Sequence, residues 1–171
     1  MALQPSHLRI GILIAVVQTL AILLQGCQYD PYAHQYTTVR PRDADVLGRY
    51  VLTNQTVTQG GISDLQGRLC VVELRADGTF IATNLPPSSS GSPRARFLST
   101  LVSGSGTWHI ESVREIDNGI GKLKTHWGIY LDSHPLKFQL AGLTGKKAPY
   151  GMIFTLGDPD SGTVMILEKT N

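Results

Sequence analysis

The chain of 171 residues has few cysteines, no excess of one charge and only one long apolar run. Two cysteines, Cys27 and Cys70, supply no disulfide framework of the kind that holds small secreted folds together. Fifteen Lys and Arg against 13 Asp and Glu give no basic surface of the sort that nucleic acid requires, so we expect no nucleic-acid partner. The apolar run is the feature from which the cellular location of the protein can be inferred.

That run extends from Ile10 to Leu24, follows the single basic residue Arg9, and ends at Leu24-Gln25-Gly26-Cys27. It is shorter than the roughly 20 apolar residues that a spanning helix needs, and this layout is typical of a signal peptide. Leu24 to Cys27 resembles the lipobox of bacterial lipoproteins. An uncleaved anchor and a conventional secreted protein are the alternatives.

The resemblance implies cleavage before Cys27, lipid on its thiol and on its new amino group, and a membrane as partner. Gln28 stands where Asp would favour retention in the inner membrane, so the resemblance implies the cell envelope, specifically the outer membrane of a Gram-negative bacterium. Several acyl chains anchor a protein stably where one chain does not. If Cys27 is a thioether, Cys70 is left alone; a disulfide between Cys27 and Cys70 is the alternative.

The sequence predicts three parts: a signal helix over 1–26, a lipidated Cys and flexible tether over 27–46, and a β domain over 47–171. The tether is polar, contains two prolines, and shows neither helical nor strand periodicity. Its three tyrosines have an alternative role, which is to cover a barrel edge or bind a partner.

From Leu47 onward, apolar residues alternate with polar ones in short runs separated by turn residues, the pattern of half-buried strands. Asp77-Gly78 is typical of a hairpin turn. Eight strands are expected, over 48–57, 68–75, 79–84, 107–111, 123–131, 136–143, 150–156 and 163–169. An antiparallel meander of eight strands closes most simply into a small barrel, which leaves no exposed sheet edge.

Three segments resemble those of small lipocalin-like barrels in bacterial lipoproteins. They are Leu47-Gly48-x-Tyr50-x-Leu52, Val72-x-Leu74-x-x-Asp77-Gly78-Thr79-Phe80 and Gly106-Thr107-Trp108-x-Ile110. Two irregular features interrupt the meander: Phe97 to Val102 fits one short amphipathic helical turn, with a strand as the alternative, and Gly104-Ser105-Gly106 is expected to break the chain before the next strand.

No catalytic constellation is readable, so we expect no enzyme and no cofactor. Cys70 alternates inward and should be a buried thiol. His109 and His126 fall on outer faces of adjacent strands; ordinary exposed histidines explain them better than a surface metal pair.

Two binding hypotheses remain. In the first, the barrel holds a small apolar ligand against Tyr50, Phe80, Trp108 and Trp127, with Phe97 to Val102 as a lid. In the second, the interior is filled and the basic loop carrying Arg94 and Arg96 docks a protein, as an inhibitor, immunity or envelope-assembly factor would. The mouth with the longest loops is expected to face away from the membrane, with the tether entering at the opposite end.

Overall fold

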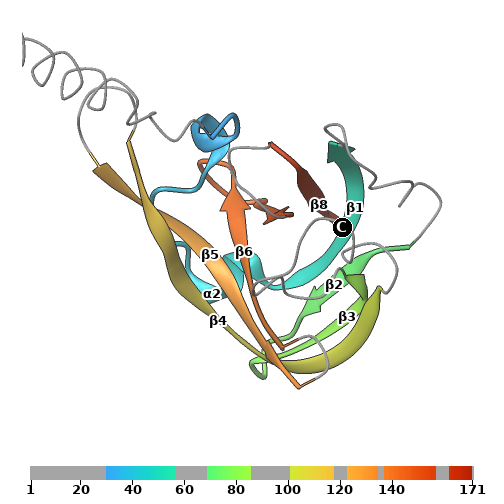
Figure 1. Cartoon of the computed structure of the whole chain (residues 1–171). Coiled ribbons are helices and arrows are strands. Elements are labelled where there is room, and N and C mark those ends of the chain that lie inside the picture. The colour runs from blue at the N-terminus through green and yellow to red at the C-terminus, as the bar shows by residue number, and fades with distance from the viewer. Residues whose placement is uncertain are drawn as a thin grey trace, which may run out of the picture.

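A computed structural model describes residues 30–56, 69–85, 101–117, 123–134, 137–156 and 162–170. Its sheet is a closed antiparallel barrel in which each strand pairs with the next and the last pairs with the first (Figure 1). The strands are β1 Gly48–Thr56, β2 Val71–Leu74, β3 Thr79–Leu85, β4 Val102–Asp117, β5 Leu123–Ser133, β6 Lys137–Thr144, β7 Gly151–Thr155 and β8 Val164–Thr170. The all-β, eight-stranded meander expected from the sequence is therefore confirmed, and it matches a small lipocalin-like barrel. The expected signal helix lies outside the described residues.

Strand alternation builds the barrel interior as the sequence predicts. Inward side chains from all eight strands form one core that includes Tyr50, Cys70 and Phe80, all fully buried. The predicted hairpin at Asp77-Gly78 is also present. Gly78 has a φ of +79°, and the Asp77 carboxylate accepts hydrogen bonds from the backbone N–H and hydroxyl of Thr79.

Strand β4 is longer than expected, and the predicted break at Gly104-Ser105-Gly106 is wrong. Gly104 and Gly106 are paired with Ala82 and Phe80 of β3, so strand pairing overrides the low strand propensity of glycine. A Cβ on Gly106 would lie 1.8 Å from the carbonyl oxygen of Asp132, a close approach that only glycine permits. Val102 begins β4, so a helical turn reaching Val102 is also wrong. Residues 97–100 lie outside the described residues.

The described part of the predicted tether, residues 30–46, is folded against the barrel, so the tether prediction is wrong there. Residues 30–39, which we call the clasp, contain the one-turn helix η1 (Ala33–Gln35) and lie against the barrel wall. The N–H of Thr37 donates to the carbonyl of Leu143 and the carbonyl of Thr37 accepts from the N–H of Trp127, both at 2.9 Å. The clasp thus bridges β5 and β6 beyond the last pair that joins them, Gly128 with Gly142.

After the clasp, the chain closes one end of the barrel through helix α2 (Asp43–Val46). Val46 is fully buried in the barrel core, and its carbonyl accepts a 2.7 Å hydrogen bond from the Tyr50 hydroxyl. The folded domain therefore begins at least 17 residues earlier than the expected boundary at Leu47, since Asp30 is already in place. Among the described residues, no helix is both long and apolar enough to cross a bilayer.

The start of the clasp does not lie where the sequence led us to expect the tether. A Cβ on Gly162, in the connection between β7 and β8, would be 3.3 Å from the Pro31 ring. That connection belongs to the end of the barrel opposite to the start of β1, because Thr56 at the end of β1 pairs with Val164. The clasp thus runs along the side wall, and the expectation that the chain arrives at the end of the barrel where β1 starts is wrong for the clasp.

Candidate functional site

The interior aromatic residues predicted to line a ligand site are brought together in the barrel core. Tyr50, Phe80 and Trp108 belong to one cluster, and the half-buried Trp127 packs against it. Their polar atoms have backbone partners: the indole N–H of Trp108 donates to the carbonyl of Arg75 at 3.0 Å, as the Tyr50 hydroxyl does to Val46. Burial raises the pKa of the Tyr50 phenol, so this hydroxyl stays protonated.

The exposure of these side chains limits what the interior can hold. Tyr50 and Phe80 have no accessible surface, and Trp108 keeps 8%. A side chain that borders an empty cavity large enough for water retains accessible surface. Tyr50 and Phe80 therefore border no such space, and a ligand beside them would have to displace core side chains.

The remaining predicted site residues, Cys27, Arg94 and Arg96, lie outside the described residues. Cys70 lies in the core with its side chain fully buried, as its alternation predicts. Within the described ranges, no group of three or more His, Cys, Asp or Glu side chains is arranged to hold a metal ion. His109 pairs across the strands with Tyr130 and His126 with Arg114, so the two histidines are not cross-strand neighbours.

The expectation of two exposed histidines is right for His109 and wrong for His126. The exposed His109 ring faces the Glu111 carboxylate at 3.3 Å. His126 does point to the outer face of β5, but the clasp covers it and leaves 2% of it exposed. Its imidazole stacks on the Tyr36 ring with 3.8 Å between centroids and 6° between planes.

His126 sits in a slot that glycine makes available. A Cβ on Gly142 would lie 2.5 Å from Cε1 of His126, so a larger residue there would expel the ring. The Nε2–H of His126 donates to the carbonyl of Leu143 at 3.3 Å, because a carbonyl can only accept. The other nitrogen, Nδ1, is buried without a partner. Burial lowers the pKa of His126 to about 4, with the Arg114 charge contributing, although the hydrogen bond to Leu143 opposes the shift.

An ion pair fixes the start of the clasp to β4. The Asp30 carboxylate accepts from the Arg114 guanidinium and, at 2.6 Å, from the Tyr36 hydroxyl. The same guanidinium lies 5.6 Å from the centroid of the Tyr36 ring. Burial raises the pKa of the Tyr36 phenol, and hydrogen bonding to the Asp30 carboxylate raises it further. Asp30, Tyr36, Arg114 and His126 therefore form one connected cluster on the outer wall.

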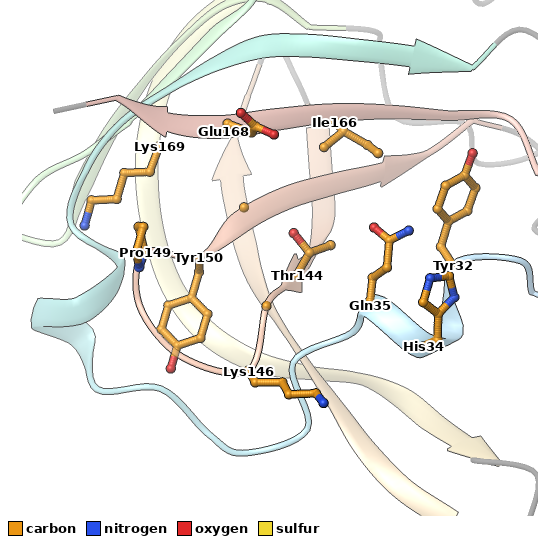
Figure 2. A pocket seen from close by; sticks show the side chains of 12 residues that line it. Tyr32, His34, Gln35, Thr144, Lys146, Pro149, Tyr150, Ile166, Glu168 and Lys169 are labelled. Carbon is orange, nitrogen blue, oxygen red and sulfur yellow. The ribbon is translucent and has the colours of Figure 1, made fainter.

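Two hollows flank the clasp. The first, of about 670 Å³, lies between the clasp and β8; Figure 2 shows Tyr32 at one end of it and Lys169 at the other, with Gln35 and Thr144 between them. The second, which we call the hairpin hollow, has about 580 Å³ and lies between the clasp and the β4–β5 hairpin. Its lining includes Asp30, Val39, Lys124 and Lys146.

The sequence analysis did not predict the outer-wall cluster. Strand alternation correctly places His126 on the outer face, but alternation carries no information about what covers that face. The one available signal was the set of tyrosines before the barrel, for which edge covering was an open alternative. Tyr36 performs that role.

Comparison with known proteins adds no relative. The chain matches no protein-family model, no curated protein and no solved structure.

Proposed function

We propose that this chain is a lipid-anchored, non-catalytic binding protein of the bacterial cell envelope, with a filled barrel that binds a protein partner through its surface. The observation that carries this choice is the complete burial of Tyr50 and Phe80. A pocket for a small apolar ligand has a volume of roughly 300 Å³ or more, and its walls stay accessible when it is empty. The two fully buried aromatic residues favour the filled interior over the ligand carrier.

Hydrogen bonding also supports a structural role for three buried polar groups. Tyr50 and Trp108 in the core, and His126 on the outer wall, each donate a hydrogen bond to a backbone carbonyl. A catalytic group needs access to a substrate proton or atom, which these groups lack. The lipid anchor at Cys27, the outer-membrane location and the role of Arg94 and Arg96 in docking rest on the sequence alone.

The test combines native mass spectrometry with affinity capture, using the full chain purified in mild detergent from its own host. We expect the chain to carry lipid mass but no further small molecule. We also expect it to retain a protein partner that the double variant Arg94→Glu, Arg96→Glu loses. The matched control is Arg49→Glu, Arg75→Glu. It makes the same charge change at exposed positions near the end of the barrel where β1 starts.

A small bound mass would contradict the filled barrel if it disappears in Trp108→Ala or Trp127→Ala. That result would identify the chain as a carrier of apolar ligands. Loss of the partner in the control variant as well would argue against docking by the Arg94 and Arg96 loop.

A further inference from the structure

We infer that the wall of the barrel covered by the clasp lies on the surface of an anionic lipid bilayer. The contact face is formed by the clasp, the outer face of the neighbouring β4–β5 hairpin and the connection between β6 and β7; its members are Pro31, His34, Val39, Lys124 and Lys146. This inference rests on the proposed lipid anchor at Cys27. It adds an orientation: the side wall of the barrel, and not one of its mouths, faces the membrane.

The first argument for this orientation is the short length of chain between Cys27 and Asp30. Only Gln28 and Tyr29 separate Cys27 from Asp30. Three residue steps reach at most about 11 Å even when fully extended. In the folded chain Asp30 lies against the barrel, because Arg114 of β4 and the Tyr36 hydroxyl hold its carboxylate. A lipidated Cys27 lies at the bilayer surface, so the wall around Asp30 must lie within about the same short distance of it.

The second argument is that this wall exposes an apolar side chain. Val39 of the clasp is 72% exposed, the highest value among the exposed large apolar residues of the described chain. It lines the hairpin hollow together with Lys124 of β5. In Figure 1 the β4–β5 hairpin runs beside the blue N-terminal segment. An exposed apolar side chain beside a lipid attachment point is suited to the boundary between headgroups and acyl chains.

Charge around the hairpin hollow fits an anionic surface. The exposed Lys124 and Lys146 both line the hollow, together with the exposed His34. Among the described residues that line the hollow, the one carboxylate is Asp30, which Arg114 neutralises. The flexible stems of the two lysines allow their ammonium groups to reach headgroup phosphates while Val39 approaches the bilayer.

Site-directed nitroxide labelling of the full-length, lipidated protein in phosphatidylethanolamine–phosphatidylglycerol vesicles tests the orientation. The label is placed at Val39→Cys, with Ile81→Cys as the control on the outer face of β3. Both sites are exposed, so the core stays intact. Cys70 is buried and Cys27 would be a thioether, so labelling is selective. The label at position 39 should lose accessibility to a water-soluble nickel complex and gain accessibility to oxygen, whereas the label at 81 should stay aqueous.

The electrostatic component is tested with Lys124→Glu, Lys146→Glu carrying the label at position 39. Each lysine removed from an anionic surface should lower the ratio of bilayer-contacting to free label by about fivefold. Vesicles of phosphatidylcholine alone should show no such difference between the variant and its parent.

The intact mass of the same samples separates the two proposals. A lipidated chain whose label at 39 is as aqueous as the label at 81 would overturn the orientation and leave the anchor standing. A chain without lipid mass that does not float with vesicles would overturn both.

Discussion

The barrel interior and the clasp each bury a tyrosine, and they do so by different means. Tyr50 lies inside the barrel because alternation along β1 points it there, and its hydroxyl finds the carbonyl of Val46 four residues away. Tyr36 lies on the outer wall, where its partners Arg114 and His126 come from β4 and β5. The interior is thus assembled from every strand, whereas the clasp is one segment that joins β5 and β6 where their own pairing ends. The comparison predicts that the interior controls global unfolding and the clasp a local opening.

The largest effect is expected from Phe80→Ala, which empties the centre of the core. Truncation of a fully buried phenylalanine costs about 3–5 kcal/mol of the free energy of unfolding. Tyr36→Ala should lower this free energy less, and should speed hydrogen exchange at the amides of Thr37 and Trp127 while leaving the amides of β2 and β3 protected. Denaturant titration and native-state exchange measure both. Equal losses of stability, with uniform faster exchange, would show that clasp and barrel unfold as one unit.

The next effect is a loss of stability at acid pH caused by His126. Its pKa is about 4 in the folded protein and about 6.5 when unfolded, so between these values the unfolded chain binds more protons. Stability therefore falls as the pH drops from about 6.5 towards 4, by up to about 3 kcal/mol.

Denaturant titrations at pH 7 and pH 4.5 measure this loss, and His126→Gln should remove most of it. His109→Gln is the control, because that ring is already exposed. The groups facing His126 are Tyr36, Arg114 and, through them, Asp30. A pH dependence that survives in His126→Gln would assign it to other groups.

A smaller loss is expected from Gly142→Ala, which places a methyl group in the slot of the His126 ring. Such overpacking costs about 1–3 kcal/mol. In the His126→Ala background the slot is vacant, and the added methyl group should cost much less. A double-mutant cycle of unfolding free energies measures this coupling. Additive losses would mean that the backbone of β6 or the Ile153 side chain, whose Cγ2 would lie 3.1 Å from the added methyl group, resists the substitution, and not the His126 ring.

The smallest effect is expected from Asp30→Asn, which removes the charge that holds the start of the clasp. The pair with Arg114 is partly exposed, so the loss should be about 1 kcal/mol or less. Limited proteolysis should nevertheless cut the clasp faster. Glu73→Gln, which breaks the more exposed pair with Arg75, is the control. Unchanged cleavage would assign the retention of the clasp to Tyr36 and its backbone bonds.

Alternation and turn chemistry within a few residues predict the number and order of the strands, the hairpin at Asp77-Gly78 and the inward face of the barrel. Prediction from the sequence was wrong where the conformation of a segment depends on contacts with distant parts of the chain. Gly104 and Gly106 continue β4 because β3 pairs with them, and residues 30–46 are ordered because the barrel wall accepts them.

The burial of His126, the ion pair of Asp30 with Arg114 and the position of the clasp on one side wall all depend on tertiary packing. The residues that make these contacts are far apart in the chain, and no local periodicity links them. The physical reason is that a strand pattern specifies which face a side chain occupies, whereas burial depends on what the rest of the chain lays against that face.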